Sequence, residues 1–281
     1  MKPFDKIIET LLINGTLTEQ AGLFYGKTGV AIFFFHHARH TGNELFADYA
    51  MDLIEEVQKQ INEVKYPARY DIGLAGIGAG FEYILQNGFL ETNDSGFFED
   101  FDARMYRTVM YEPYPDFSLE NGLSGWGRYF VCRLRGNGHK DSRLHQAMVH
   151  IVKETSQKIA ANAIPESEQP DVFRFLCDLV TLTDYAGKYD NLLLQCKQWA
   201  CIREPDMQTI FPRMNNLQRF YTCQKYLGID LSEEIEKEWE KWQEAGNESL
   251  TGMGLLKGWA REGLLHLTSI NKDETSWINL L

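Results

Sequence analysis

Two acidic residues stand next to glycine-rich hexapeptides that are almost copies of one another. One residue separates Asp71 from GLAGIG at 73–78, and one residue separates Glu120 from GLSGWG at 122–127. Two carboxyl groups facing one cavity are the requirement of glycoside cleavage, one acting as acid and the other as base or nucleophile. Acids at helix starts also cap the helix or complement its dipole without doing chemistry. Other acids in equivalent places are Asp116 and Asp171.

Aromatic and cationic residues gather near the same hexapeptides and their variants. The aromatic residues are Tyr25, Tyr70, Tyr114 and Trp126, and the cationic residues are Lys27, Arg213 and Arg261. Aromatic rings stack on sugars or on peptide side chains, and cations beside helix N-termini suit an anionic group. Rim packing and ordinary salt bridges would use the same residue types. Our candidate site therefore has Asp71 and Glu120 as catalytic residues, with substrate-binding residues Tyr25, Lys27, Trp126, Arg213 and Arg261.

Three histidines in the segment IFFFHHARH offer a possible metal face. His36 and His40 have the i, i+4 spacing of two ligands on one helix, with His37 between them. The intervening residues do not form a metalloprotease motif, and no third ligand follows nearby. Cationic histidines at a helix C-terminus complement the dipole there, which is the simpler interpretation.

The elements that would position these residues recur along the chain. LFYGKTGVAIFFF at 23–35 and LLKGWAREGLLHL at 255–267 vary the same pattern, and our alignment equates Gly26, Gly76, Gly125 and Arg261. A spacing of roughly 50 residues is typical of repeat architectures. Three steps of about 45 residues would fill the long final interval, which predicts two degenerate units, at 170–182 and 214–227. Both keep a helical spacing of apolar residues but lack the glycines.

Amphipathic segments alternate with these apolar ones. They cover 4–13, 44–62, 98–111, 142–161, 188–200 and 232–244, with apolar residues at i, i+3 and i+4. No long alternating strand pattern occurs in the sequence. We therefore predict one all-α domain over 1–281, an (α/α)6 toroid of six inner apolar and six outer amphipathic helices. Glycine at the inner-helix starts would let the chain turn sharply and let neighbouring helices approach.

In such a toroid the N-termini of the inner helices converge on one end of the ring. Their free amide groups would give a cavity there a partly positive lining. We predict that the largest pocket opens at this end, lined by Asp71, Glu120, Arg213 and Arg261. The opposite outcome, aromatic side chains filling this mouth, would leave a scaffold that works through its outer surface.

Three stretches resemble the lanthionine synthetase C-like family: SLENGLSGWGRYF at 118–130, YDIGLAGIGAGFEYIL at 70–85, and the segment 23–57. The resemblance implies an (α/α)6 toroid with glycine signatures at its inner helices. It also implies a zinc ion, bound by two cysteines and one histidine, that activates a peptide thiolate for addition to a dehydroamino acid.

The residues that this zinc chemistry needs are absent from the matching positions. IFPRMNN at 210–216 stands where the family has one ligand cysteine, and LTGMGLL at 250–256 stands where it has the Cys-His pair. Ser118 occupies the place of the family aspartate, and no His-Gly occurs near 170–177. We therefore predict a divergent member with no zinc and no other cofactor, which is not a zinc-dependent cyclase.

Composition limits the partners and the cellular location that we expect for the protein. The formal net charge of −12 argues against nucleic acid as a partner and favours a positively charged substrate or peptide. Five cysteines without a CxxC pair fit reduced thiols. The first residues contain acids within a short apolar stretch, so we expect neither a signal peptide nor a membrane span, and a cytoplasmic protein.

Two functions remain open at this level. In the first, the protein binds a ribosomally made peptide, or peptide-modifying enzymes, and takes part in peptide maturation. In the second, it is a carbohydrate-active toroid enzyme that uses Asp71 and Glu120. The first follows the family resemblance, and the second follows an analogy of fold.

Overall fold

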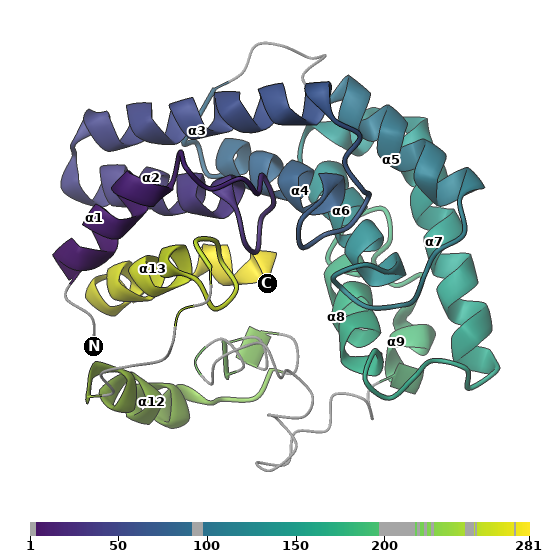
Figure 1. The fold of residues 1–281 in the computed structure, drawn as a ribbon. Coiled ribbons are helices and arrows are strands. Elements are labelled where there is room, and N and C mark those ends of the chain that lie inside the picture. Colours follow the sequence, from purple (N-terminus) through teal and green to yellow (C-terminus); the bar gives the residue numbers. More distant parts are fainter. Residues whose placement is uncertain are drawn as a thin grey trace. The chain divides into compact units, whose positions relative to one another are not determined.

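The structure is a computed structural model that describes residues 4–91, 98–196, 217, 220–221, 224–225, 228–244, 250, 252–272 and 274–281. Eleven α-helices and two short 3-10 helices make up its regular structure (Figure 1). No β-strand occurs among the described residues. The all-α class predicted from the sequence is therefore confirmed for this part of the chain.

The chain divides into two compact units, and the first combines Met1–Lys65 with Phe211–Leu281. Its helices are α1 (Phe4–Asn14), α2 (Lys27–Thr41), α3 (Glu44–Glu63), α12 (Ser232–Glu244), α13 (Trp259–Ile270) and the 3-10 helix η3 (Ser276–Leu280). Helix α2 packs against α3 and α13, and α1 packs against α13 (Figure 1). A helix near the end of the sequence thus lies beside two helices near its start.

The second unit comprises Tyr66–Ile210. Its helices are α4 (Leu74–Gln86), α5 (Glu99–Tyr111), α6 (Leu123–Arg135), α7 (Ser142–Ala160), α8 (Gln169–Leu179) and α9 (Asp190–Cys196), with the 3-10 helix η1 (Asn137–Lys140). Helix α6 packs against α4, α7 and α8, and α5 packs against α4 and α7.

Burial separates the helices into two kinds. Every residue of α2 from Lys27 to Ala38 is buried, and so is every residue of α4 from Leu74 to Ile84. Helices α3, α5 and α7 bury only one stripe, as an amphipathic helix over a core does. The sequence predicts this division into enclosed apolar helices and covering amphipathic ones.

The helix positions agree closely with the predicted segments. Helices α1, α3, α5, α7 and α12 match the amphipathic segments, and α8 matches the first degenerate unit at 170–182. Of the segment 188–200, only α9 lies among the described residues. The second degenerate unit at 214–227 lies largely outside them.

Four helices begin in the same way. The N-cap residues of α2, α4, α6 and α13 are all glycines in extended conformation: Gly26, Gly73, Gly122 and Gly258. In each case the N–H of the first helical residue donates to the carbonyl seven residues earlier, at 2.9–3.0 Å. The four donor–acceptor pairs are Lys27–Gln20, Leu74–Pro67, Leu123–Asp116 and Trp259–Gly252. The loop before each helix therefore folds back over the first turn.

This arrangement explains the N-cap glycines and corrects our alignment. A Cβ on Gly73 would collide with the carbonyl oxygen of Pro67, and one on Gly122 with that of Asp116. Gly26 is the N-cap equivalent of these two residues, so the alignment of Gly26 with Gly76 was wrong by three positions. These glycines accommodate the preceding loop, whereas we had expected them to accommodate a neighbouring helix as well.

The close approach of helices depends on a second set of glycines, five residues after the N-cap glycines. Gly78 of α4 faces the ring of Tyr129 in α6, and a Cβ at position 78 would lie 2.5 Å from its Cε2 atom. Further pairs of the same kind are Gly127 with Phe175 of α8, and Gly263 of α13 with Phe33 of α2. A side chain at any of these glycines would force the aromatic ring out of its place.

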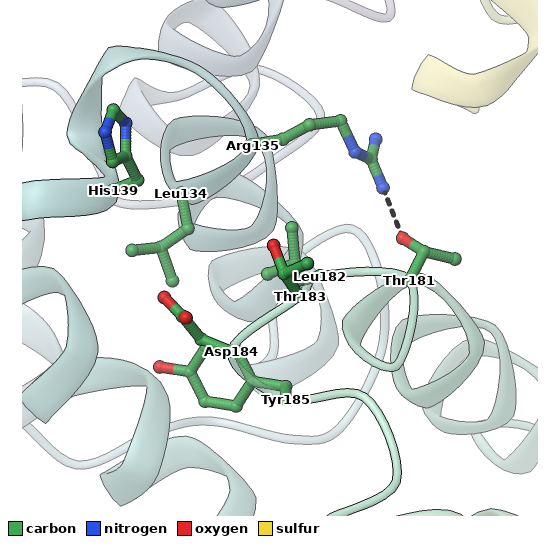
Figure 2. A pocket seen from close by; sticks show the side chains of 8 residues that line it. All are labelled: Leu134, Arg135, His139, Thr181, Leu182, Thr183, Asp184 and Tyr185. Atoms are coloured by element: carbon green, nitrogen blue, oxygen red, sulfur yellow. Dashed lines mark hydrogen bonds between the residues drawn. The ribbon is translucent and has the colours of Figure 1, made fainter.

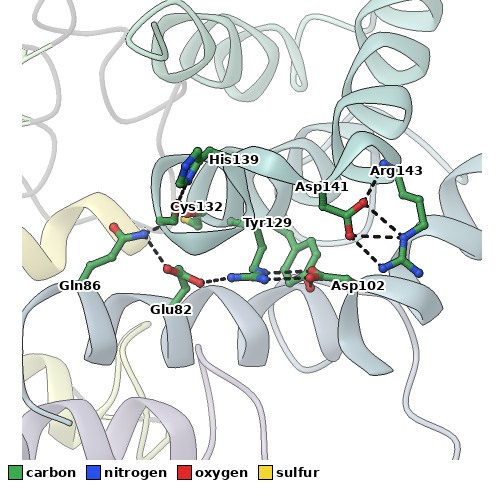
Figure 3. A network of polar contacts seen from close by, with 10 residues as sticks. Glu82, Gln86, Asp102, Tyr129, Cys132, His139, Asp141 and Arg143 are labelled. Atoms are coloured by element: carbon green, nitrogen blue, oxygen red, sulfur yellow. Dashed lines mark hydrogen bonds and ion pairs between the residues drawn. The ribbon is translucent and has the colours of Figure 1, made fainter. Parts of the chain in front are cut away.

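Buried charges tie α4, α5 and α6 together. Arg133 donates from Nε and Nη2 to the two oxygens of Asp102, at 3.0 and 2.8 Å, and from Nη1 to Glu82. Tyr129 donates its hydroxyl proton to Asp102 Oδ1 at 2.6 Å, and Gln86 donates to Glu82 Oε1 at 3.0 Å (Figure 3). One guanidinium thus balances two buried carboxylates.

Candidate functional site

The loops before α4 and α6 are joined through their backbones. The carbonyl oxygen of Glu120 accepts hydrogen bonds from the N–H groups of Tyr70, at 2.8 Å, and Asp71, at 3.4 Å. The two loops that carry the predicted carboxylates are therefore neighbours within the second unit. The half-buried Glu120 contributes its main chain to this link.

Asp71 is buried, and its carboxylate is held from three directions. Arg69 donates from Nε to Oδ1 at 2.8 Å and from Nη2 to Oδ2 at 2.5 Å, and the N–H of Ile72 donates to Oδ1 at 2.8 Å. An arginine that contacts both oxygens fixes the orientation of the carboxylate. These contacts favour a role for Asp71 in ordering its loop, and its catalytic role stays a prediction.

The loop before α6 is organised by Asp116. Its Oδ1 atom accepts from the N–H of Ser118 at 2.8 Å and from the Ser118 hydroxyl at 2.6 Å. Ser118 Oγ accepts in turn from the N–H of Asn121 at 3.2 Å. Ser118 is the position where the resemblance would require an aspartate, and here its hydroxyl serves the local turn.

Two acids at the start of α8 pin the same loop. Glu168 Oε2 accepts from the N–H of Phe117, and Asp171 Oδ2 accepts from the N–H of Leu119, both at 2.8 Å. Burial raises the pKa of Asp171 to about 6, although the Leu119 hydrogen bond and the charges of Arg174 and Arg128 lower it. A carboxyl group with a pKa near 6 has a value suited to general acid catalysis.

A buried group of charges beneath these loops was not singled out from the sequence. Arg128 and Arg174 are each the sixth residue of their helices, α6 and α8, and both are buried. Arg128 Nη1 lies 3.7 Å from Asp178 Oδ2, and its Cζ lies 5.8 Å from the centre of the Tyr70 ring. Burial also raises the pKa of Tyr70. The available signal was an arginine directly before an aromatic residue in the apolar part of each helix.

The predicted substrate-binding residues divide between the two units. Tyr25, Lys27 and Arg261 belong to the first, and Trp126 belongs to the second. Trp126 is buried, and its Nε1–H has no hydrogen-bond partner among the described residues. Arg213 lies outside the described residues. The pocket predicted at the inner-helix starts, which includes Arg213, stays a prediction.

In the first unit, the predicted cations lie beside acids. The buried Lys27 ammonium pairs with Glu56 of α3. Arg261 is fully buried at the third position of α13, and its Nη2 atom lies 3.6 Å from Glu262 Oε2. Tyr25 is half-buried, with its ring 6.4 Å from that of Phe24.

The segment before α13 does not fit a zinc ion. Its residues Gly252–Leu256 carry no thiol, imidazole or carboxylate side chain. The N–H of Leu256 donates to the carbonyl of Phe24 at 2.9 Å, and a Cβ on Gly254 would lie 2.6 Å from the same carbonyl group. Backbone contact therefore fills the space where the resemblance would require ligands.

The histidines of α2 are used in packing. His36 is buried, with Nδ1 3.0 Å from Glu274 Oε1, and this contact lowers the pKa of Glu274. His37 stacks on the ring of Phe33, with centroids 5.7 Å apart, and burial lowers its pKa. Within the described part of the chain, no three histidine, cysteine or acidic residues form a group that would hold a metal ion.

No protein-family model matches the sequence, and no curated protein matches it significantly. Among the described helices, none combines the length and the apolar character needed to span a bilayer.

Proposed function

We propose that the chain is a lanthionine synthetase C-like toroid that binds a ribosomally made peptide and takes part in its maturation without zinc-dependent thioether formation. The observation that carries this proposal is the common start of α2, α4, α6 and α13. Each has an N-cap glycine and a hydrogen bond from its first helical N–H to the carbonyl seven residues earlier. The starts of α2, α4 and α6 coincide with the three segments that resemble the family.

The contacts between enclosed helices support the ring arrangement. The fifth residue of one helix is a glycine that receives an aromatic ring from the seventh residue of another. This contact recurs from α4 to α6, from α6 to α8, and from α13 to α2. A closed ring of inner helices requires such repeated contacts, including one that joins the last helix to the first.

The chemistry of the site favours peptide recognition over cyclisation. The segment before α13 offers no zinc ligand, and its backbone packs directly on Phe24. Without a bound metal ion, a peptide thiol keeps its proton at neutral pH, which slows its addition to a dehydroamino acid. The acidic chain attracts basic peptides.

A carbohydrate-active toroid is the second candidate, and one observation favours it. Asp171 has a pKa of about 6 and lies beside the loop that carries Glu120. A raised carboxyl pKa is what a glycosidase acid needs. Asp71 suits that reaction less well because Arg69 contacts both of its oxygens.

Fluorescence anisotropy separates the two candidates. The probe is a labelled, lysine-rich peptide that contains one cysteine and one dehydroalanine, and the control is an acidic peptide of equal length. We expect saturable binding of the basic peptide that weakens as salt is added, because exposed charges are screened. Absence of peptide binding, together with hydrolysis of a chromogenic oligosaccharide, would replace the first candidate with the second.

A further inference from the structure

A pocket of about 290 Å³ lies in the second unit, where α6 and α8 end (Figure 2). It is separate from the loops of Asp71 and Glu120, which precede the starts of α4 and α6. Binding sites for drug-sized ligands occupy about 300–1,000 Å³, so this pocket suits a small molecule. The proposed function assigns no role to it.

One side of the pocket presents a cation. Arg135 is exposed, and its Nη2 atom donates to Thr181 Oγ1 at 2.9 Å (Figure 2). Thr181 donates its own proton to the carbonyl of Asp178 at 2.6 Å, so the hydroxyl holds the guanidinium in one orientation. Among the described residues, no carboxylate forms an ion pair with Arg135. Its other N–H groups are therefore available to a ligand.

The acid across the pocket is directed elsewhere. Asp184 Oδ2 lies 3.8 Å from His145 Nε2, an atom that also lies 2.9 Å from the carbonyl of His139. Because a carbonyl only accepts, Nε2 carries a proton, and His145 Nδ1 lies 2.8 Å from the Tyr185 hydroxyl oxygen. Asp184 thus lies closest to His145, and among the described residues it forms no ion pair with Arg135.

Part of the pocket lining is apolar and firmly held. Leu134 and Leu182 are buried and lie between the two polar sides (Figure 2). The buried ring of Tyr185 stacks on His145, with centroids 5.8 Å apart, and on Tyr189, at 6.3 Å. A ligand here would place an apolar body on leucine and tyrosine side chains while its charged end meets Arg135.

We propose that this pocket binds a small organic anion, with a carboxylate or phosphate on Arg135 and an apolar body on Leu134, Leu182 and Tyr185. A planar guanidinium donates two parallel hydrogen bonds to either group. The exposed hydroxyl of Thr183 offers a further hydrogen bond at the rim. The chemistry shared by the two ligand types is an oxyanion joined to an apolar group.

Ligand-detected NMR with the full chain tests the proposal. The probes are benzoate and phenyl phosphate, each up to about 10 mM, a range that detects the weak affinity of small ligands. Benzamide is the uncharged control. We expect either anion or both to bind more tightly than benzamide, and to bind less tightly as salt is added. No binding of either anion, or equal binding of benzamide, would overturn the proposal.

Two substitutions assign the binding to Arg135. Arg135→Glu should weaken anion binding on the order of tenfold or more, because it replaces a charge-assisted contact with repulsion. Arg143→Gln is the matched control, since Arg143 is an exposed arginine of the same unit that pairs with Asp141. Equal affinities in wild type and Arg135→Glu, or an equal loss in Arg143→Gln, would contradict the assignment.

Discussion

The guanidinium of Arg69 contacts both oxygens of the Asp71 carboxylate, at 2.8 and 2.5 Å. Asp71 is buried, whereas about a third of the Arg69 side chain is exposed. The pair closes the loop that enters α4, next to the backbone link with Glu120. Asp71, which the sequence predicts as a catalytic residue, thus helps to order the loop before α4.

Asp71→Asn should therefore lower the free energy of unfolding by about 1–2 kcal/mol. The variant loses the charged contact, and the exposed part of Arg69 can turn to water. Urea denaturation measures the change, with the exposed Glu112→Gln as a control expected to be near neutral. Unchanged stability together with lost peptide binding would instead show that Asp71 acts in recognition.

Gly78→Ala should destabilise the protein by about 1–3 kcal/mol, because the new Cβ would collide with the Tyr129 ring. Gly252→Ala is the matched control. A Cβ there meets only the Tyr25 ring, at 3.7 Å, which is ordinary contact. Thermal unfolding of the two variants should separate them clearly, and equal effects would contradict the packing described for α4 and α6.

Arg133→Met should cost about 3–5 kcal/mol, because it leaves the carboxylates of Glu82 and Asp102 buried without their cation. Arg143→Met removes the partner of the exposed Asp141 pair and should cost less than about 1 kcal/mol. Chemical denaturation at neutral pH compares the two. A small loss for Arg133→Met would mean that water reaches these carboxylates.

Asp171→Asn should make stability less sensitive to pH. Burial raises the pKa of Asp171 from 3.8 to about 6, so between these values the folded chain keeps a proton that the unfolded chain releases. Wild-type stability should therefore fall as the pH rises from about 4 to about 6, and this contribution should then level off.

The variant keeps an oxygen that accepts from the Leu119 N–H. Relative to the wild type, its free energy of unfolding should therefore rise by on the order of 2 kcal/mol between about pH 4 and about pH 6. Asp141→Asn is the control. The hydrogen bond with Arg143 lowers the pKa of Asp141. The difference in stability between Asp141→Asn and the wild type should therefore not change with pH above about pH 5. Parallel wild-type and Asp171→Asn curves would contradict the assigned pKa.

The sequence predicts the helices well because the pattern of burial determines which residues are apolar. A helix that is buried on all sides is apolar throughout, and a helix that is buried on one side has a single apolar stripe. It also predicts that the loops of Asp71 and Glu120 lie next to each other, since both precede the same hexapeptide. It does not reveal the contact of Arg69 with Asp71, which depends on the loop folding back. Nor does it reveal the Arg135 pocket, whose residues come from two helix ends that share no motif.

Native mass spectrometry of the full chain with the cysteine- and dehydroalanine-containing peptide tests whether the protein binds this peptide without forming a thioether. Thioether formation leaves the peptide mass unchanged, so iodoacetamide is used to count the remaining thiols. We expect a protein–peptide complex and a peptide thiol that stays free whether or not Zn²⁺ is added. Absence of a complex, or a loss of the thiol that depends on both the protein and Zn²⁺, would contradict this expectation.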